Sequence, residues 1–470
     1  MKPKLPFFYD FVFPNFILPN ALDSRMGIIN YIHTLFTPGR TSESFFDNNL
    51  ETPNSPMKLL FGNSLGTWPI SLRMNGSNLR DHCYTDFVDI DEDALYLGKG
   101  RHNKYIYPIK MSPHFEPFAG YAEPGSKLNG EWFWKNMSAE ALKDAQTGKA
   151  FIFLDWAHEN HLNKSLFTML HNSISSSGIP KSQIILAHNG FNAQEVYENW
   201  FPAEERRLTV KSWPFLIFHN SWHYSQPRNF SARMQEEVFF STKDTLRDYH
   251  FLFRTRRARS YRTTLLYKLA SDRLLDKGNW SCLDNIPMQD GLRNSTRYSF
   301  SLDLEAVTKL HTLIPKALHN EPNGTFNNIA GWSDTNFIAS KTSYFDITTE
   351  TATTTEYHCF TEKVCKPLVN FQPFLFVGFP GGLKLLRELG FKTFSPFIDE
   401  SYDMEQDENI RLQMIYSEIT RLCNMSKEEI HNWYWSMSDI LLHNHRHFLE
   451  FHKTDTYNTD LIKYLNNCVN

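Results

Sequence analysis

The sequence of 470 residues lacks any run of about 18 apolar residues, the length from which a transmembrane helix is predicted. Four prolines in the first 20 residues, together with Asp10 and Asn15, interrupt the apolar core that a signal peptide needs. The six cysteines are scattered and none of them shows CxxC spacing. These absences predict a cytoplasmic protein whose thiols are reduced.

Several motifs of catalytic and metal sites are also missing. The sequence has no P-loop and no G-x-S-x-G elbow. An Asp-x-Asp within 89–93 is interpreted as an acidic turn, and His219 and His223 have no third metal ligand nearby. The three histidines of 443–447 fall on different faces of an expected helix. We therefore expect no bound metal ion and no cofactor.

The composition is that of a globular protein with large cores. Hydrophobic residues make up 41% of the chain, charged residues 21% and aromatic residues 15%. The length is sufficient for two or three domains. The net charge of −4 argues against general nucleic-acid binding, although it leaves room for a local basic patch.

From residue 150 onward, predicted strands and helices alternate, which indicates parallel βαβ units. We expect an α/β protein with two Rossmann-like domains that face a cleft and with a helical tail. The N-terminal domain is assigned to 1–235, irregular to about 145 and Rossmann-like over 150–225; the second domain is assigned to 245–405 and the tail to 406–470. The predicted strands are 83–90, 104–111, 150–155, 182–190, 213–221, 249–254, 297–303, 343–350, 373–379 and 391–394.

Helices are predicted between these strands and in the tail. In the predicted helix 162–178, the apolar stripe of Leu162, Leu166, Leu170 and Ile174 is followed by Gly178, which is typical of a helix end. In the tail, Ser426 and Glu429 have the spacing of a capping box at the start of a long helix. The other predicted helices are 138–148, 192–201, 260–275, 304–318, 360–370, 381–390 and 408–423.

A cluster of arginines lies at one predicted turn between a strand and a helix. Guanidinium groups beside a helix N-terminus suit a diphosphate, because they donate paired hydrogen bonds to its oxygens. The alternatives are a solvated basic edge and a nucleic-acid patch. The cluster consists of Arg254, Arg256, Arg257, Arg259 and Arg262.

A second polar cluster follows the predicted strand 343–350. Glu350 ends this strand, and Thr361, Glu362 and Lys363 begin the next helix. A carboxylate at such a place can accept hydrogen bonds from ribose hydroxyls, and a lysine can neutralise a phosphate. The alternative is that Glu362 only favours the helix N-terminus.

Taken together, the two clusters resemble a known family. The order of a strand, an arginine-containing turn and a helix, then Glu350, a spacer, Thr361-Glu362-Lys363 and a helix, is similar to the donor-binding domain of fucosyltransferase-like glycosyltransferases of the GT-B fold. The resemblance covers about 248–422 and is most specific at 350–403, where it extends to uncharacterised bacterial and phage proteins of this group.

The resemblance implies roles for individual residues on the donor side. Arg262 would contact the donor diphosphate, Glu362 the ribose and Lys363 a phosphate oxygen, and Glu350 matches the family's upstream glutamate. Arg254 and Thr361 are also candidate donor-binding residues. Cys359 stands where the family has a tyrosine, and Tyr357 is the candidate to replace that tyrosine. The family's Glu-Asn-Ser is Glu-Thr-Ala here, so the nucleotide and the sugar stay open.

The N-terminal half is expected to bind the acceptor and to supply a general base. The candidates are Asp155, His158 and Glu159, just beyond a predicted strand, and the alternative for each is helix capping or surface polarity. The sequence thus predicts a metal-independent glycosyltransferase that moves a sugar from a nucleotide-sugar to a hydroxyl of a glycan. The acceptor could instead be a base of nucleic acid, or the chain could be a non-catalytic binding protein on the same scaffold.

Overall fold

The computed structural model describes most of the chain beyond residue 138 and short segments before it. The chain divides into unit 1, residues 1–215 with 456–470, and unit 2, residues 216–455. The described residues are 4–5, 67–69, 89–90, 104–111, 139–156, 162–256, 258–283, 286–318, 337–351 and 353–469.

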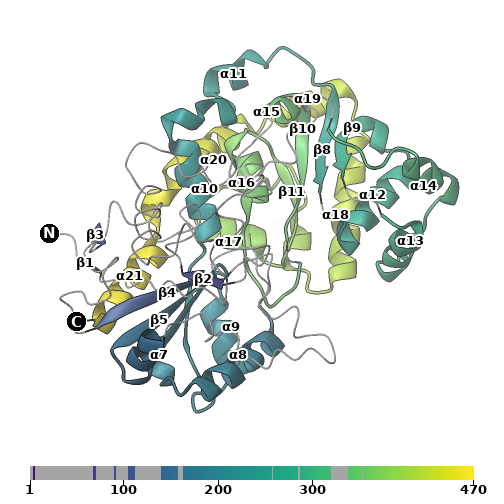
Figure 1. Ribbon diagram of the computed structural model, residues 1–470. Coiled ribbons are helices and arrows are strands. Elements are labelled where there is room, and N and C mark those ends of the chain that lie inside the picture. Colours follow the sequence, from purple (N-terminus) through teal and green to yellow (C-terminus); the bar gives the residue numbers. More distant parts are fainter. Residues whose placement is uncertain are drawn as a thin grey trace, which may run out of the picture. The chain divides into compact units, whose positions relative to one another are not determined.

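The described part of unit 1 is built around a five-stranded sheet (Figure 1). Its strands, in spatial order, are β2 (Thr67–Pro69), β4 (Tyr105–Met111), β5 (Ala150–Trp156), β6 (Ile184–His188) and β7 (Thr209–Ser212). The last four are parallel, and β2 joins β4 in the antiparallel sense. β6 is buried along its whole length, as expected for a parallel strand covered on both faces. Separately, β1 (Lys4–Leu5) pairs with β3 (Asp89–Ile90).

The helices of unit 1 bury the apolar stripes that the sequence indicates. In α8 (Lys164–Ser177), Phe167, Leu170 and Ile174 are at most 1% exposed, and Gly178 ends the helix at φ +71°. The last helix, α21, returns to this unit, because the Tyr464 hydroxyl lies 3.3 Å from Thr209 Oγ1 of β7. The other elements are α7 (Ala139–Gln146), the 3₁₀ turn η5 (Lys181–Gln183), α9 (Ala193–Trp200) and α21 (Thr456–Val469).

Unit 2 contains a four-stranded parallel sheet within the described residues. In spatial order its strands are β11 (Phe374–Val377), β10 (Ser343–Thr349), β8 (Tyr249–Thr255) and β9 (Gly278–Cys282). Because the strands are parallel, their carboxyl ends lie along one edge of the sheet. The polar residues that follow β8 and β10 are therefore brought to the same edge.

Helices cover the unit 2 sheet and include the whole predicted tail up to residue 455 (Figure 1). α18 packs against β8 and β11, α19 against β10, and α20 against α16. The α-helices are α10 (Phe215–Ser225), α11 (Glu236–Ser241), α12 (Ser260–Ser271), α13 (Met288–Arg297), α14 (Leu304–His311), α15 (Phe337–Lys341), α16 (Glu362–Val369), α17 (Gly382–Glu388), α18 (Glu408–Cys423), α19 (Lys427–Trp435) and α20 (Ser438–Phe451). The 3₁₀ turns are η6 (Pro227–Ala232), η7 (Leu275–Lys277), η10 (Ser401–Met404) and η11 (His452–Thr454).

The expected α/β class, with parallel sheets in both halves and a helical C-terminal segment, is confirmed. None of the helices in the described ranges has the length and apolar character needed to cross a membrane. The division of the chain differs from the sequence-based one: residues 216–235 belong to unit 2, and 456–470 belong to unit 1.

Three strand predictions are wrong. Residues 213–221 form no strand but lie largely in α10. The side chains of 215–218, at the start of this helix, are all buried, so every side of its first turn is apolar. A continuous apolar run of this kind does not distinguish a strand from a buried helix. Of residues 297–303, Arg297 is the last residue of α13 and the others follow this helix, with Ser299 at a positive φ of 58°. Residues 391–394 lie outside the strands of the described chain, and Phe391 and Phe394 pack in aromatic clusters there. The strands that were not predicted include β7, which ends directly before 213–221, and β9, whose Gly and Asn are unusual in strands.

The tail confirms the capping box but not the single long helix. Ser426 Oγ accepts the Glu429 N–H at 3.1 Å, and Glu429 Oε2 accepts the Ser426 N–H at 2.7 Å. The helix that starts here ends at Trp435, and α20 begins at Ser438 after a short turn. The capping bonds satisfy backbone donors that the first helical turn leaves without partners.

We predict that Ser426→Ala lowers the free energy of unfolding by about 1 kcal/mol, because it removes the side-chain acceptor at the N-cap. Urea unfolding of the full chain measures this as a lower midpoint at an unchanged slope. Ser417→Ala is the control, since Ser417 is exposed within α18 and its hydroxyl donates to the Gln413 carbonyl one turn earlier. Equal midpoints for the two variants would contradict the role of the cap.

Candidate functional site

The buried carboxylate of Glu350 lies at the carboxyl end of β10 and organises this edge of the unit 2 sheet. Its side chain is 0% exposed. One oxygen accepts the Thr361 N–H at 3.0 Å, and the other accepts the Thr361 hydroxyl at 2.5 Å. Burial raises the pKa of the Glu350 carboxyl group, and Lys363 and the bonds from Thr361 oppose this rise. Glu350 therefore holds the start of α16 against the end of β10.

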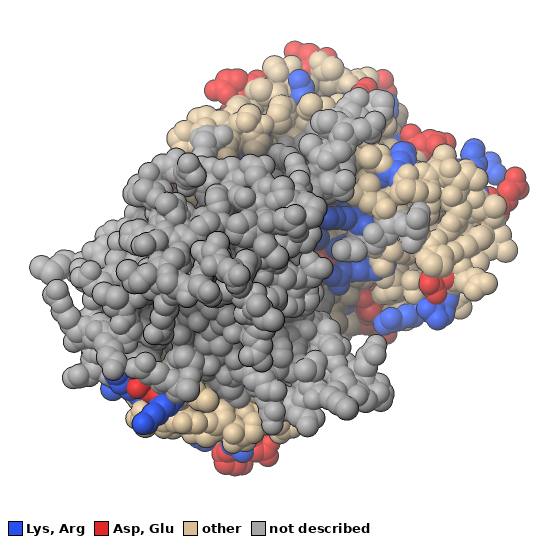
Figure 2. Space-filling view, viewed as in Figure 1, with Lys and Arg blue, Asp and Glu red and all other residues tan. Residues whose placement is uncertain are grey.

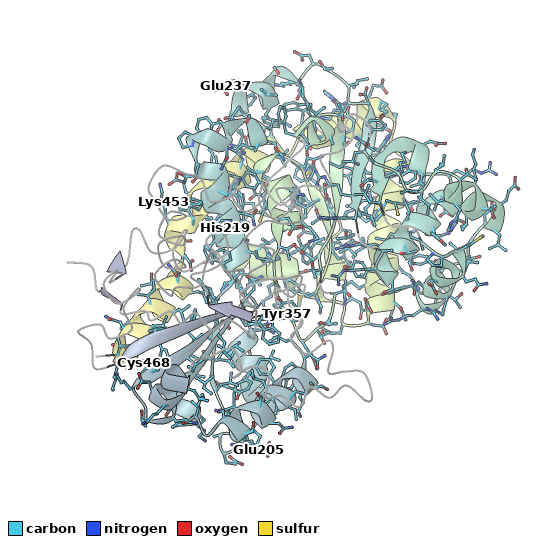
Figure 3. The ribbon with its side chains drawn as sticks, viewed as in Figure 1. Glu205, His219, Glu237, Tyr357, Lys453 and Cys468 are labelled. Carbon is cyan, nitrogen blue, oxygen red and sulfur yellow. The ribbon has the colours of Figure 1, made fainter. Side chains whose placement is uncertain are left out.

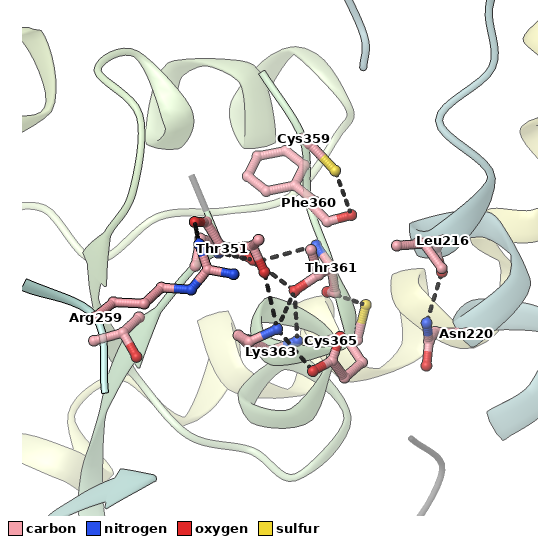
Figure 4. Close-up of polar contacts among 12 residues, drawn as sticks. Leu216, Asn220, Arg259, Thr351, Cys359, Phe360, Thr361, Lys363 and Cys365 are labelled. Atoms are coloured by element: carbon pink, nitrogen blue, oxygen red, sulfur yellow. Dashed lines mark hydrogen bonds and ion pairs between the residues drawn. The ribbon is translucent and has the colours of Figure 1, made fainter. Parts of the chain in front are cut away.

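Thr361 is the N-cap of α16 and is also buried. Its Oγ1 accepts the Lys363 N–H at 3.4 Å and a hydrogen bond from Lys363 Nζ at 3.1 Å. Lys363 Nζ also donates to Glu362 Oε1 at 2.8 Å and to Thr351 Oγ1 at 3.2 Å (Figure 4). The Lys363 side chain remains 23% exposed and that of Glu362 14%. The Thr-Glu-Lys sequence thus places a partly exposed ion pair at the first turn of α16.

The first turn of α12 binds the other side of the β10 end. Arg262 Nη2 donates to the carbonyls of Thr349 at 2.9 Å and Glu350 at 3.0 Å, and the Tyr261 hydroxyl donates to the Glu350 carbonyl. Arg262 is only 4% exposed. In this structure its guanidinium group holds backbone carbonyls, and its predicted contact with a donor diphosphate stays a prediction.

Arg254 lies on β8 and forms an ion pair inside the same unit. Its Nη1 lies 2.9 Å from Asp346 Oδ2, and its Nη2 donates to Ser340 Oγ at 3.2 Å. Burial raises the pKa of Asp346, which the Arg254 charge and a bond from Thr348 oppose. Of the other arginines in the cluster, Arg257 lies outside the described residues. Arg254 therefore belongs to a structural ion pair, and a donor contact by it remains a prediction.

The loop between β10 and α16 carries the two residues at which the family resemblance departs. Tyr357 and Cys359 are 1% and 2% exposed, and Figure 3 labels Tyr357 on this loop. Between them, His358 stacks on Phe379 with 4.8 Å between ring centroids. Thr353 anchors the start of the loop. It donates to Glu408 at 2.6 Å, and its carbonyl accepts a bond from Arg411 at 2.7 Å.

The turn after β11 is closed by a carboxylate that the sequence analysis missed. Asp403 accepts the N–H groups of Leu383 at 2.8 Å and Lys384 at 2.9 Å, at the first turn of α17. Gly381, the residue directly before α17, has a φ of +79°, a conformation that favours glycine. Asp403 lies twenty residues beyond Leu383, so no local pattern indicates the contact.

The unit 1 residues predicted on the acceptor side are described only in part. Asp155 lies on β5, paired in register with Ala187 of β6, whereas His158 and Glu159 lie outside the described residues. His188, at the end of β6, was missed; its Nδ1 accepts the Gly190 N–H at 3.1 Å, and its ring meets Trp156 edge to face. The sequence offered one signal for His188, namely a histidine at the end of an apolar run and directly before Asn189-Gly190.

Within the described ranges, no group of three or more His, Cys, Asp and Glu side chains could hold a metal ion. His219 and His223 lie on α10 rather than at a strand end, with 6.3 Å between ring centroids. The three histidines of 443–447 each contact a different backbone carbonyl. Figure 2 shows a group of Lys and Arg side chains near the middle of the visible face, with acidic side chains beside it and both kinds also present toward the edges.

Neither a protein-family model nor a curated protein matches the chain. Among solved structures, the N-terminal domain of Candida albicans trehalose-6-phosphate phosphatase aligns over 100% of this chain and 97% of that one, at 9% identity and a TM-score of 0.40. An α,α-trehalose-phosphate synthase (UDP-forming) from Burkholderia vietnamiensis aligns over 68% of each chain, at 9% identity and a TM-score of 0.31. The trehalose-6-phosphate synthase OtsA aligns over 74% of this chain and 83% of that one, at 11% identity and a TM-score of 0.31. TM-scores of this size do not establish a shared fold.

We predict that Thr361→Val destabilises unit 2 by about 1–3 kcal/mol, because it leaves an oxygen of the buried Glu350 carboxylate without its hydroxyl donor. Thr361→Ser keeps the hydroxyl and should lose much less. Urea unfolding of the full chain compares the two variants. A valine variant as stable as the serine variant would show that the bond from the Thr361 hydroxyl does not stabilise the fold.

Proposed function

We propose that the protein is a glycosyltransferase that moves a sugar from a nucleotide-sugar to a hydroxyl of a glycan. The observation that carries the proposal is the partly exposed Glu362–Lys363 pair at the carboxyl edge of a parallel sheet, fixed in place by Glu350 and Thr361. Ligands of open parallel sheets bind at this edge. A carboxylate and an ammonium group side by side suit the two parts of a nucleoside diphosphate, the ribose hydroxyls and the phosphate.

In the proposed reaction, unit 2 binds the donor and unit 1 the acceptor, as in GT-B enzymes. Glu362 accepts hydrogen bonds from the ribose, and Lys363 stabilises the negative charge that develops on the departing nucleoside diphosphate. Asp155, His158 and Glu159 are the candidates for the base that removes the proton of the acceptor hydroxyl. We infer that the reaction uses these side chains rather than a metal ion.

A glycan is the preferred acceptor. A base of nucleic acid would require affinity for a polyanion, and the net charge of −4 gives no general attraction to one. A non-catalytic binding protein on the same scaffold would bind the donor without consuming it. Release of the nucleoside diphosphate from a donor in the presence of acceptor glycans therefore separates the enzyme from the binding protein.

The first test is a thermal-shift screen of the full chain with GDP, UDP, ADP, CMP and dTDP. A ligand that binds only the native state raises the melting temperature, by an amount that grows with its concentration above Kd. We expect one of these nucleotides to raise the midpoint. The absence of a shift with every nucleotide at millimolar concentration would exclude the donor site.

We further predict that Lys363→Ala reduces the affinity for the nucleotide that binds best by about tenfold or more, because a charged hydrogen-bond donor to phosphate is lost. Lys384→Ala is the matched control, since the Lys384 side chain is 60% exposed on α17 and its ammonium group lies 3.9 Å from Glu388. Calorimetric titration of both variants gives the comparison. If both bind like the wild type, Lys363 has no phosphate contact.

A further inference from the structure

A polar pocket with a volume of about 890 Å³ lies within unit 2, at the end of α17. Its wall comes from the last turn of α17, from the segment 391–401 and from α20. Neither Glu362 nor Lys363 lines it, so among the described residues it is distinct from the candidate site at the carboxyl edge of the sheet. Its volume falls in the range of pockets that bind small molecules, about 300–1,000 Å³.

Contacts with two helices hold the wall of this pocket in place. Asn444 of α20, which is 2% exposed, accepts the Lys392 N–H at 2.8 Å and donates to the Lys392 carbonyl at 2.7 Å. The Phe397 carbonyl accepts hydrogen bonds from Arg421 of α18 at 2.9 Å and from Trp433 of α19 at 3.0 Å. A ligand therefore meets a segment that is already ordered, which lowers the entropic cost of binding.

One corner of the pocket contains an internally compensated pair of charges. Arg387 Nη1 donates to Glu400 Oε2 at 3.1 Å, and the Thr393 hydroxyl donates to the same oxygen at 2.8 Å. Burial raises the pKa of the Glu400 carboxyl group, and the bonds from Thr393 and Phe394 and the charge of Arg387 oppose this rise. The Glu400 side chain is 9% exposed, whereas that of Arg387 is 45% exposed. The corner thus adds a partly exposed guanidinium group but no net charge.

The rest of the wall carries a second, more exposed pair of opposite charges, Lys392 and Asp399. Asp399 Oδ1 accepts the Ser401 N–H at 3.0 Å, and bonds from Ser401 lower the pKa of the Asp399 carboxyl group. The hydroxyl-bearing side chains of Ser395 and Ser401 also line the pocket. Donors, acceptors and hydroxyl groups that can be either therefore share one wall, on which two cationic and two anionic side chains cancel.

We propose that this pocket binds a neutral oligosaccharide, a site that goes beyond the proposed function because it does not depend on sugar transfer. Sugar hydroxyls donate and accept hydrogen bonds at once, as the mixed wall requires. The C–H faces of sugar rings are apolar, and the exposed Pro396 and partly exposed Ile440 offer them apolar contact. A strongly charged ligand gains little attraction from a wall without net charge. The volume also leaves room for more than one sugar ring.

The test is calorimetric titration of the full chain with four neutral hexasaccharides and with anionic hexagalacturonate. The neutral probes are maltohexaose, laminarihexaose, mannohexaose and N-acetylated chitohexaose. We expect at least one of them to bind with a Kd of about 1 mM or tighter and hexagalacturonate to bind more weakly. The affinity for the best neutral probe should change less than about twofold between about 50 and 300 mM NaCl, since binding screens little net charge.

Two substitutions in the wall locate the bound sugar. Lys392→Ala and Asp399→Asn should each weaken binding of the best neutral probe by about fivefold or more, because each removes a charged hydrogen-bonding group. Asparagine keeps an oxygen that can accept the Ser401 N–H, so the turn is retained. The matched controls are Lys384→Ala and Glu388→Gln, which remove the same charges from side chains 60% and 58% exposed on α17, outside the pocket. Both controls should bind within about twofold of the wild type.

The proposal is overturned if no neutral hexasaccharide binds at millimolar concentration. It is equally overturned if both wall variants bind like the wild type, because the sugar would then lie elsewhere. Tighter, salt-dependent binding of hexagalacturonate would show an anion site instead. A thermal-shift measurement with nucleotides on the same samples keeps the two proposals apart. A wild type that binds an oligosaccharide here but no nucleotide would support this pocket while excluding the donor site.

Discussion

The bonds between the Glu350 carboxylate and Thr361 determine the geometry of the unit 2 edge. A carboxylate in a fully buried place is stable only when its oxygens have donors, and here the backbone and the hydroxyl of one residue supply them. The same residue caps α16, so the strand end and the helix start are fixed to each other. Arg262 and Tyr261 bind the opposite side of this strand end. The exposed groups of Lys363 and Glu362 owe their positions to these buried contacts.

The site therefore consists of an inner layer that shapes the backbone and an outer layer that can meet a ligand. Glu350, Thr361 and Arg262 are nearly inaccessible, whereas Arg259, Glu362 and Lys363 retain exposure. This division explains how one short segment of sequence can contain so many charged residues beside an apolar strand. The inner group satisfies the backbone and one another in the interior. The outer group carries the proposed chemistry at the surface.

The sequence was sufficient to predict the parallel α/β class and the meeting of the two polar clusters, because strand ends in a parallel sheet must share an edge. It could not assign the inner and outer layers, since the sequence does not show that Arg262 inside α12 is buried while Arg259 at its N-cap is partly exposed. α10 was taken for a strand because a short apolar run has no period to distinguish the two. Asp403 and Leu383 meet across twenty residues, and only tertiary packing determines such a pair.

The return of α21 to unit 1 has a consequence for the way each unit folds. Tyr464 contacts Thr209, and Tyr457 packs edge to face on Phe191, so α21 completes a unit whose sheet lies far away in the sequence. Unit 2 is one continuous segment, whereas unit 1 is made of two segments separated by all of unit 2. Contacts between residues far apart in the sequence require a large loop to close, which slows folding. The docking of α21 on unit 1 therefore carries a loop-closure cost that the contacts within unit 2 do not.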